Sequence, residues 1–438
     1  MTATGRTRLS ERLKHLTQRR IDPAVVETLR QFLEHASDPE VARIRPLVFA
    51  ERFQLPPKDV IDACLFAAKE GILTLLWDIL CPSCRIPADV HETLATLKDH
   101  GYCPSCDLRY EIDFAKSVEL IFRSHPEIRT AETRTYCIGG PAFSAHVVAQ
   151  TRLMPGERFQ MELMLTEGSY RLRGPQLPFA VDLRVSVATG VTRFELPLLR
   201  APLPNSVPTL RHGNQVLALF NNTTRELQVR LERTADRSMA LTAAAAASIS
   251  VFREMFPNEV LAPGQIVSVT NITLLMAEIC GAHALYQSLG DGPAFGKIRT
   301  RLLQIDQTIK SHGGAIVKVV GDGVLATFQD SESAIGATTA LLTLADETLP
   351  LRMALHRSSA LVTTLNDRLD YFGEALHLLR TMLQMAEANE LLLTASCLPT
   401  GAAGTIPHLA GLQIVPLDCI IADTAIVAYR CQSIETSC

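Results

Sequence analysis

The stretch "IVKVVGDGVLATFQD", residues 316 to 330, has the pattern of two apolar strands joined by a Gly-Asp-Gly turn. An Asp-Gly pair between apolar runs is a strong local signal for a β-hairpin. One strand carries a lone cation, Lys318, and the turn carries a lone carboxylate, Asp322. Because charge in an apolar hairpin needs a partner or a ligand, these two residues are the first candidates for a functional site.

The sequence around this hairpin predicts strand, helix, hairpin, helix and strand in that order. The run "SVTNITLLMAEIC" is a continuous apolar strand that carries one carboxylate, Glu278, near its end. The segment "PAFGKIRTRLLQIDQTIKSHGG" is an amphipathic helix that Gly-Gly terminates. A helix, "SESAIGATTALLTLADE", and a strand, "LRMALHRSSALVTTL", follow the hairpin. Residues 266–438 are therefore expected to form one α+β domain.

The whole chain has the composition of a multidomain globular protein. It has 438 residues, of which 47% are apolar and 20% charged, which is enough for two to four domains. The net charge of −4 gives no basic field for nucleic acid or an anionic membrane. The N-terminus has no apolar core of a secretory signal, and no apolar run reaches the ~18–20 residues that span a bilayer. We expect a cytoplasmic protein without a membrane partner.

Residues 1–78 are predicted to be helical and winged-helix-like. The segment "DPAVVETLRQFLEHA" has an Asp cap followed by Pro at the first helical position. The helix that would read DNA, Lys58 to Lys69, has two lysines and two acids, too little positive charge for phosphate contacts. A helical scaffold is therefore favoured over a DNA-binding regulator, and nucleic acid is not an expected partner.

Residues 79–115 are predicted to form a zinc ribbon. Two Cys-x-x-Cys segments have the spacing of paired zinc knuckles, and they contribute Cys81, Cys84, Cys103 and Cys106. Four thiolates around one tetrahedral Zn²⁺ leave no position for water, so this zinc is expected to be structural. Such a site also needs a reducing compartment, because oxidised cysteines do not hold the metal.

The next region, residues 116–240, alternates between apolar and polar residues in short stretches separated by turns. Segments such as "ERFQMELML", "SYRLR" and "RELQVRLER" predict a β-sandwich or a barrel. No catalytic constellation is evident there, so sensing, docking or support of a dimer is its expected role. Residues 241–265, with "TAAAAASISVFREMFPNE" and the turn "LAPGQ", are predicted to form a linker helix and turn.

Residues 266 to about 395 resemble the catalytic domain of class III adenylate and guanylate cyclases. In that family a first strand ends in an acid, a "GDG" hairpin tip carries a second acid, and an Asp-aromatic-x-Gly segment opens a helix. The stretches "GGAIVKVVGDGVLATF" and "LNDRLDYFG" match these features. The region before residue 266 resembles, more loosely, an uncharacterised module joined to bacterial cyclases. The resemblance implies a ferredoxin-like catalytic domain that works as a homodimer.

The resemblance also implies roles for individual residues. Glu278, the Ile279 backbone and Asp322 match the positions that hold two Mg²⁺ or Mn²⁺ ions, and oxygen ligands suit these hard cations. Lys318 matches the residue that hydrogen-bonds adenine N1, and Asp370 matches the acceptor of the adenine amine. Gly281 lies in the turn that faces the phosphates. This set implies ATP as the substrate, with cyclic AMP and pyrophosphate as products.

Several positions depart from the family pattern. The first metal acid is glutamate instead of aspartate, and the phosphate-facing turn is Gly281-Ala282-His283. His377 stands where the family has a ribose-orienting asparagine, and Thr381 stands where it has a transition-state arginine. Arg380 lies one residue early, about 100° around a helix. Losing one preorganised charge stabiliser commonly costs about 10²–10³ in rate.

Two interpretations follow from these departures. The first is an adenylate cyclase-like signalling protein with weakened or unusual chemistry, in which His377 and Arg357 compensate. The second is a pseudocyclase that binds ATP, or nothing, and relays a signal to a protein partner. A DNA-binding regulator built from the winged helix and zinc ribbon is a remote third.

Overall fold

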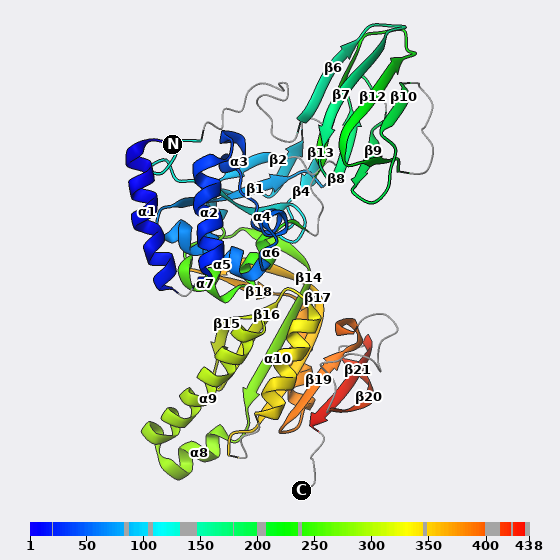
Figure 1. Ribbon diagram of the computed structural model, residues 1–438. Coiled ribbons are helices and arrows are strands. Elements are labelled where there is room, and N and C mark those ends of the chain that lie inside the picture. Colours follow the sequence, from blue (N-terminus) through cyan, green and yellow to red (C-terminus); the bar gives the residue numbers. More distant parts are fainter. Residues whose placement is uncertain are drawn as a thin grey trace.

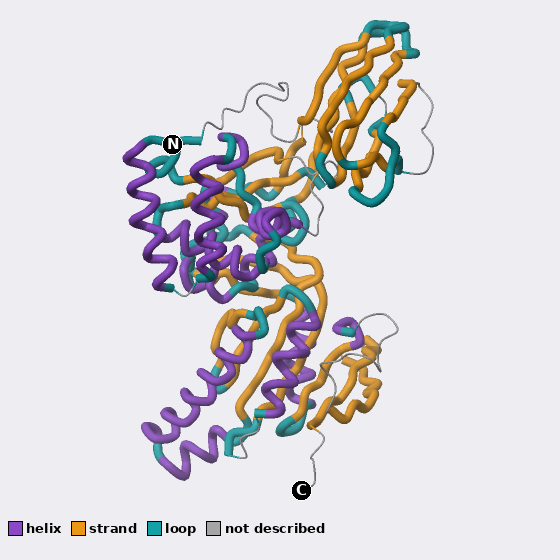
Figure 2. The backbone as a smooth tube through the Cα atoms, viewed as in Figure 1, coloured by secondary structure: helices purple, strands orange, loops and turns teal. Residues whose placement is uncertain are grey.

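The structure is a computed structural model that describes residues 1–19, 21–82, 87–103, 108–131, 147–177, 179–198, 207–234, 239–344, 348–398, 412–421 and 424–433. Helices with small sheets form the N-terminal part, strands alone form a second part, and a long sheet flanked by helices forms the C-terminal part (Figure 1). Helix and strand both contribute heavily (Figure 2), so the chain is a mixed α/β protein as predicted. In the described part, no helix combines the length and hydropathy needed to cross a bilayer.

The N-terminal part begins with helices that bury their apolar faces against one another. They are α1 (Ala3–Gln18), α2 (Pro23–His35), α3 (Asp38–Ala42), α4 (Pro46–Phe53) and α5 (Pro57–Lys69). The Asp22 carboxylate accepts the Ala24 amide at 2.8 Å, and Pro23 occupies the first position of α2. This cap and the helix that follows it are confirmed as the sequence predicts.

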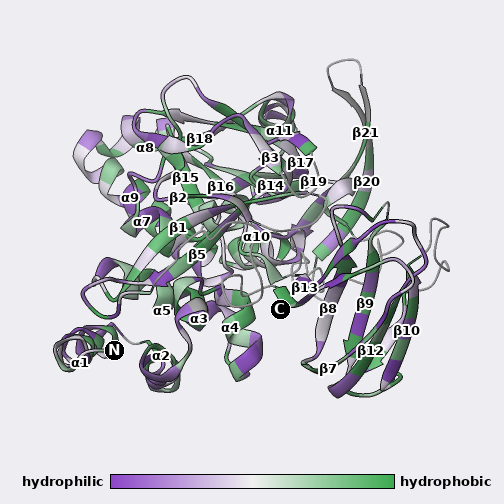
Figure 3. Ribbon diagram, turned by 90° about the horizontal axis from the view of Figure 1, so that it is seen from above, coloured by the Kyte–Doolittle hydropathy of each residue, from purple (hydrophilic) through white to green (hydrophobic). Residues whose placement is uncertain are grey.

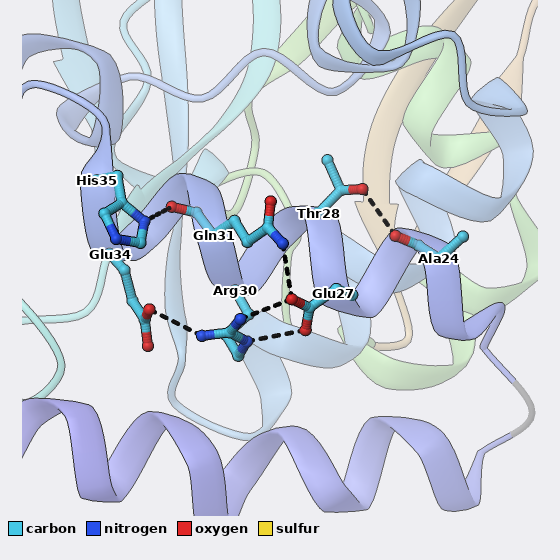
Figure 4. A network of polar contacts seen from close by, with 7 residues as sticks. All are labelled: Ala24, Glu27, Thr28, Arg30, Gln31, Glu34 and His35. Carbon is cyan, nitrogen blue, oxygen red and sulfur yellow. Dashed lines mark hydrogen bonds and ion pairs between the residues drawn. The ribbon is translucent and has the colours of Figure 1, made fainter.

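The outer face of α2 carries a charged network (Figure 4). Arg30 donates to Glu27 at 2.6 and 2.8 Å and to Glu34 at 2.8 Å. These hydrogen bonds lower the pKa of Glu27 to about 2. Val25 and Leu29 lie on the buried face. The network therefore marks the solvent side of the helix, where ion pairs add little stability.

The helices pack against a sheet in the order β2-β1-β5, and a separate hairpin, β3-β4, lies between β2 and β5 in the chain. The bounds are β1 (Leu73–Leu80), β2 (Pro87–His91), η1 (Leu94–Thr96), β3 (His100–Cys103), β4 (Leu108–Glu111) and β5 (Val118–Ser124). The predicted boundary at 78/79 falls within β1. Strand β5, which was predicted within the β-rich region, pairs along β1 from Leu73↔Ser124 to Ile79↔Val118. Local periodicity does not identify a distant pairing partner, so this junction required the tertiary structure.

The second part consists of two facing sheets, β10-β12-β7 and β11-β9-β8-β13-β6. The strands are β6 (Val147–Leu153), β7 (Arg158–Leu165), β8 (Gly168–Arg173), β9 (Val181–Ser186), β10 (Arg193–Leu198), β11 (Thr209–Arg211), β12 (Gly213–Asn221) and β13 (Leu227–Thr234). Their inward residues form a separate hydrophobic cluster that includes Leu172, Leu198 and Leu219. Hydrophobic and hydrophilic residues lie side by side on these strands (Figure 3), as expected for sheets with one solvated face.

The predicted linker helix is two short helices, α6 (Ala243–Ala247) and α7 (Ser250–Met255). Ile249 between them has extended backbone angles, and the Ser248 hydroxyl donates back to Ala244 O at 3.0 Å. Such a bond from a serine competes with regular helix and favours a break. The Leu120 amide donates to Leu241 O at 2.7 Å, so the start of this segment joins strand β5.

The C-terminal part is an eight-stranded sheet with the order β15-β16-β14-β17-β19-β21-β20, to which β18 adds by pairing with β17. Its elements are β14 (Ile266–Ile279), α8 (Ala282–Leu289), α9 (Asp291–Ser311), β15 (Ala315–Val320), β16 (Gly323–Phe328), α10 (Ser331–Thr343), β17 (Leu351–Leu365), β18 (Arg368–Phe372), α11 (Glu374–Met385), β19 (Glu390–Thr394), η4 (Ala395–Cys397), β20 (Leu412–Ile421) and β21 (Thr424–Ser433). The predicted order of strand, helix, hairpin, helix and strand is confirmed. The central order β17-β14-β16-β15 is that of a ferredoxin-like βαββαβ unit.

Both faces of this sheet are buried. Leu275 and Phe328 point to the face that also buries Ile305 of α9 and Ile335 of α10. Leu274 points to the opposite face, within a cluster that also contains α11 and the N-terminal helices. One continuous core therefore joins the sheet to the N-terminal part of the chain.

Candidate functional site

Lys318 and Asp370 meet across two strands that are distant in sequence. The Lys318 Nζ lies 2.6 Å from Asp370 Oδ2, and it also lies 5.6 Å from the centre of the Phe372 ring. The side chain of Lys318 is 36% exposed, whereas that of Asp370 is 8% exposed. The Tyr371 amide donates to Asp370 Oδ1 at 2.8 Å. A donor and an acceptor therefore stand side by side, next to an aromatic ring, at an accessible position.

A β-bulge decides which way Lys318 points. The β15–β16 register shifts between Ile316, which opposes Ala326, and Lys318, which opposes Leu325. Leu325 belongs to the face shared with the N-terminal helices. Without the extra residue, strict alternation would turn Lys318 toward the opposite face, because a one-residue slip moves every side chain across the sheet.

The hairpin β17–β18 supplies Asp370. Its turn residues Asn366 and Asp367 have φ of 50° and 57°, the positive values that a two-residue type I′ hairpin needs. In the ladder Thr363 opposes Asp370. This hairpin folds back beside β15, so Asp370 reaches Lys318.

The residues predicted to hold metal also come together. Glu278 is near the end of β14 and opposes Gly323, the residue that follows Asp322. The Ile279 amide donates to Asp322 O at 3.0 Å. A Cβ on Gly323 would lie 2.6 Å from Ala277 O, so only glycine permits this approach. Glu278, Ile279 and Asp322 are therefore neighbours where strand β14 ends and strand β16 begins.

Arg352 changes the chemistry at these strand ends. It opposes Glu278 on β17, and its Nε and Nη2 lie 2.7 and 2.5 Å from Glu278 Oε2. A guanidinium thus pairs with one of the two carboxylate oxygens, and it balances the charge of the carboxylate. Across the described ranges, no group of three or more His, Cys, Asp or Glu residues is arranged to hold a metal ion. A cation at Glu278 would have to use the other carboxylate oxygen or displace Arg352, and the metal site stays a prediction.

The turn predicted to face the phosphates and the helix predicted to be catalytic have simpler surroundings. Gly281 has a φ of 78°, a left-handed conformation that favours glycine, and it precedes α8. His377 and Arg380 are exposed on α11. The Thr381 hydroxyl donates to His377 O at 3.0 Å, a bond within the helix. Burial lowers the pKa of His356, whose Nδ1 lies 2.9 Å from the Thr394 hydroxyl.

Of the four cysteines predicted to hold zinc, Cys81 directly follows β1 and Cys103 ends β3. Leu80 pairs with Pro87, and Cys103 pairs with Leu108. Cys81 and Cys103 are 0% and 2% exposed and belong to the same core. Cys84 and Cys106 lie outside the described residues, so the zinc site stays a prediction.

Sequence reasoning missed two arginines near these groups. Arg352 is recognisable only once the strand register sets it opposite Glu278. Arg253 of α7 donates to Leu369 O at 2.9 Å and to Val317 O at 3.4 Å, beside Asp370 and Lys318. No local pattern in "FREMF" indicates these contacts.

Comparisons with known proteins find one matching family and a set of similar solved structures. Residues 8–136 match a family described as of unknown function (DUF5939). No curated protein matches the chain. The solved structures that match include catalytic domains of nucleotide cyclases.

Three of these solved structures illustrate the similarity. The adenylyl cyclase CyaB from P. aeruginosa is 16% identical, with a TM-score of 0.33, over 40% of this chain and 99% of that one. The guanylate cyclase domain of RhGC from Catenaria anguillulae, in complex with GTP, is 12% identical, with a TM-score of 0.33, over 38% and 99%. The catalytic core of a rhodopsin-guanylyl cyclase with converted specificity, in complex with ATPalphaS, is 13% identical, with a TM-score of 0.34, over 39% and 99%.

Replacing Arg352 by methionine should strengthen Mn²⁺ binding. The substitution keeps an unbranched stem but frees Glu278 beside Asp322. We expect the affinity to rise about threefold to tenfold, because a partly exposed ion pair competes with the metal by roughly 1 kcal/mol. Titration of Mn²⁺ followed by electron paramagnetic resonance measures this change.

The matched control is Arg357→Met, on the same strand but away from Glu278. It should leave Mn²⁺ affinity unchanged. If Arg352→Met bound no more Mn²⁺ than the wild type and the control, the ion pair would not be what limits metal binding.

Proposed function

We propose that residues 266 to about 395 form a class III cyclase-like domain that binds ATP through Lys318 and Asp370 and converts it to cyclic AMP and pyrophosphate weakly or not at all. The observation that carries this proposal is the 2.6 Å contact between Lys318 Nζ and Asp370 Oδ2 from two separate hairpins. It supports the base-reading role that the sequence resemblance assigns to both residues.

The pair matches the hydrogen-bonding edge of adenine. Adenine presents an acceptor, N1, beside a donor, the exocyclic amine. Lys318 is a donor and the ionised Asp370 is an acceptor, so the two can face that edge together. Guanine presents a carbonyl and a ring N–H in the reverse order. It would place its carbonyl oxygen against the carboxylate, and a buried polar group left unpaired is costly.

The surroundings of Glu278 support weak turnover. Its carboxylate is held by Arg352, and the family's transition-state arginine is replaced by Thr381, whose hydroxyl bonds within its own helix. The chain thus keeps the two residues proposed to read the base, whereas its residues at the positions of the family's charge-stabilising groups differ from the family pattern. Binding energy that is equal in ground and transition states does not accelerate a reaction.

The second candidate function is that of a pseudocyclase, an inactive nucleotide-binding or scaffolding regulator. The Glu278–Arg352 ion pair favours it, because a carboxylate that is already charge-balanced by a neighbouring strand suits a stable scaffold. In either case we propose a cytoplasmic signalling role, a homodimer formed through the cyclase-like domain, and a protein partner downstream. The input signal would enter through the N-terminal part, whose core is continuous with the sheet.

We also propose that Cys81, Cys84, Cys103 and Cys106 hold one structural Zn²⁺. Support comes from the spacing of the two Cys-x-x-Cys segments in the sequence and from the burial of Cys81 and Cys103 in one core. Four thiolates from two such segments suit a closed tetrahedral site. The zinc would stabilise the folded state of residues 79–115, whose strands β2, β3 and β4 are short.

Replacing Lys318 by methionine should weaken ATP binding about tenfold or more, because a charge-assisted hydrogen bond is lost. GTP binding should change far less. Calorimetric titration with each nucleotide measures both affinities. Lys297→Met, an exposed lysine on α9, is the matched control and should bind like the wild type. Equal losses for ATP and GTP would overturn the assignment of the base-reading pair.

Cyclic AMP formation from ATP with Mn²⁺ or Mg²⁺ separates the two candidate functions. A weak enzyme should form product that Asp322→Ala removes, and Thr381→Arg with His377→Asn should raise the rate by up to about 10²-fold. A pseudocyclase should form no product in either background. Rapid turnover by the wild-type protein would contradict both.

Zinc content tests the cysteine assignment. The purified protein should carry roughly one zinc per chain, measured by elemental analysis, as a four-thiolate site requires. Cys84→Ser and Cys106→Ser should each remove most of the metal, whereas Cys280→Ser, at a partly exposed cysteine on the cyclase-like sheet, should not. A folded wild-type protein without zinc would refute the site.

A further inference from the structure

Arg253 links three segments of backbone at the junction between the N-terminal part and the cyclase-like sheet. Its Nη2 donates to Leu369 O at 2.9 Å and to Val317 O at 3.4 Å, and its Nη1 donates to Ala247 O at 3.3 Å. Helix α7, which carries it, lies beside β15 and β18 (Figure 1). Burial lowers the pKa of this guanidinium. Desolvation makes these hydrogen bonds costly to lose.

The two carbonyls on the sheet are the ones that precede the base-reading residues. Val317 is the extra residue of the bulge, because Ile316 opposes Ala326 and Lys318 opposes Leu325. A bulged residue is left out of the ladder, so its carbonyl needs another donor. Arg253 supplies that donor, and the same guanidinium holds the carbonyl before Asp370 on the neighbouring hairpin.

Arg253 is itself anchored in the N-terminal part. The neighbouring Phe252 packs edge-to-face on Trp77 of β1, with ring centres 5.9 Å apart. The Trp77 Nε1 donates to Glu259 at 2.9 Å, and Glu259 also accepts the Leu94 amide at 3.1 Å, just beyond β2. A shift of this part would therefore move the guanidinium relative to β15 and β18.

We propose that Arg253 is a positioning residue for adenine recognition: it holds the bulge at Val317 and the strand at Leu369, and so sets Lys318 and Asp370 against each other. This role rests on the proposed nucleotide function of that pair. It makes base selectivity depend on the N-terminal part. A guanidinium suits it because Nη2 reaches both sheet carbonyls while Nη1 donates to Ala247 O, whereas an ammonium has one nitrogen for all three.

The first experiment measures ATP and GTP affinity by calorimetry in Arg253→Met, Arg253→Lys and the wild type. We expect both variants to lose about tenfold in preference for ATP over GTP, the scale of one charge-assisted hydrogen bond. Arg299→Met, an exposed arginine on α9, should retain the wild-type preference. An unchanged preference in Arg253→Met would overturn the proposal, as would full rescue by Arg253→Lys.

A double variant separates positioning from a general loss of stability. If Arg253 acts through Lys318 and Asp370, then Arg253→Met should remove less ATP preference in the Lys318→Met background than in the wild type. Independent, additive losses would contradict the proposal. Unfolding midpoints of all variants, measured alongside, identify any variant that fails to fold.

Amide hydrogen exchange decides the contact independently of nucleotide binding. In Arg253→Met, amides of residues 315–320 and 368–372 should exchange faster, while those of β19 should be unchanged. Unchanged exchange in both segments would overturn the positioning role. If the wild type binds neither nucleotide, the proposed function fails, and this measurement still shows whether Arg253 holds the two strands.

Discussion

Strand β14 buries side chains on both of its faces, and the rest of the molecule is arranged around that constraint. Leu275 contributes to the core under α9 and α10, whereas Leu274 contributes to the core shared with the N-terminal helices. A strand buried on both sides needs a cover on both sides, because exposed apolar surface is unfavourable. Helix α11 covers part of the second face, and the N-terminal part covers more of it.

This shared core gives the N-terminal part a direct contact with the candidate site. Helix α7 reaches β15 and β18 because the hydrophobic face of the sheet extends to them. Phe252 and Tyr371 are both buried in that core. The polar contacts of Arg253 are made beside Lys318 and Asp370, so the orientation of this pair is coupled to packing elsewhere.

Two ion pairs in the same sheet have different consequences. Lys318 and Asp370 join two hairpins and leave a donor and an acceptor partly accessible, so a ligand can use both. Glu278 and Arg352 join neighbouring strands directly, and the pair satisfies a carboxylate that would otherwise attract a cation. The first pair therefore offers both a hydrogen-bond donor and an acceptor to a ligand, whereas the second pair neutralises its own carboxylate. This difference is the basis of the proposed function, in which the domain binds nucleotide but converts it weakly or not at all.

The sequence determined the strand, helix, hairpin, helix and strand between residues 266 and 365, because strand alternation, the Asp-Gly turn and the Gly-Gly helix stop are local signals. It also indicated Lys318 and Asp370 through a family resemblance. It could not supply the pairing of β1 with β5, the break at Ile249, the bulge at Val317, or Arg352 and Arg253 as partners. The break at Ile249 follows the local bond from Ser248 to Ala244 O, whereas the strand pairing, the bulge and the two arginine contacts depend on which segments meet and in what register. Register is decided by burial across the whole sheet, and a one-residue shift turns a side chain to the other face, so only the tertiary structure could decide it.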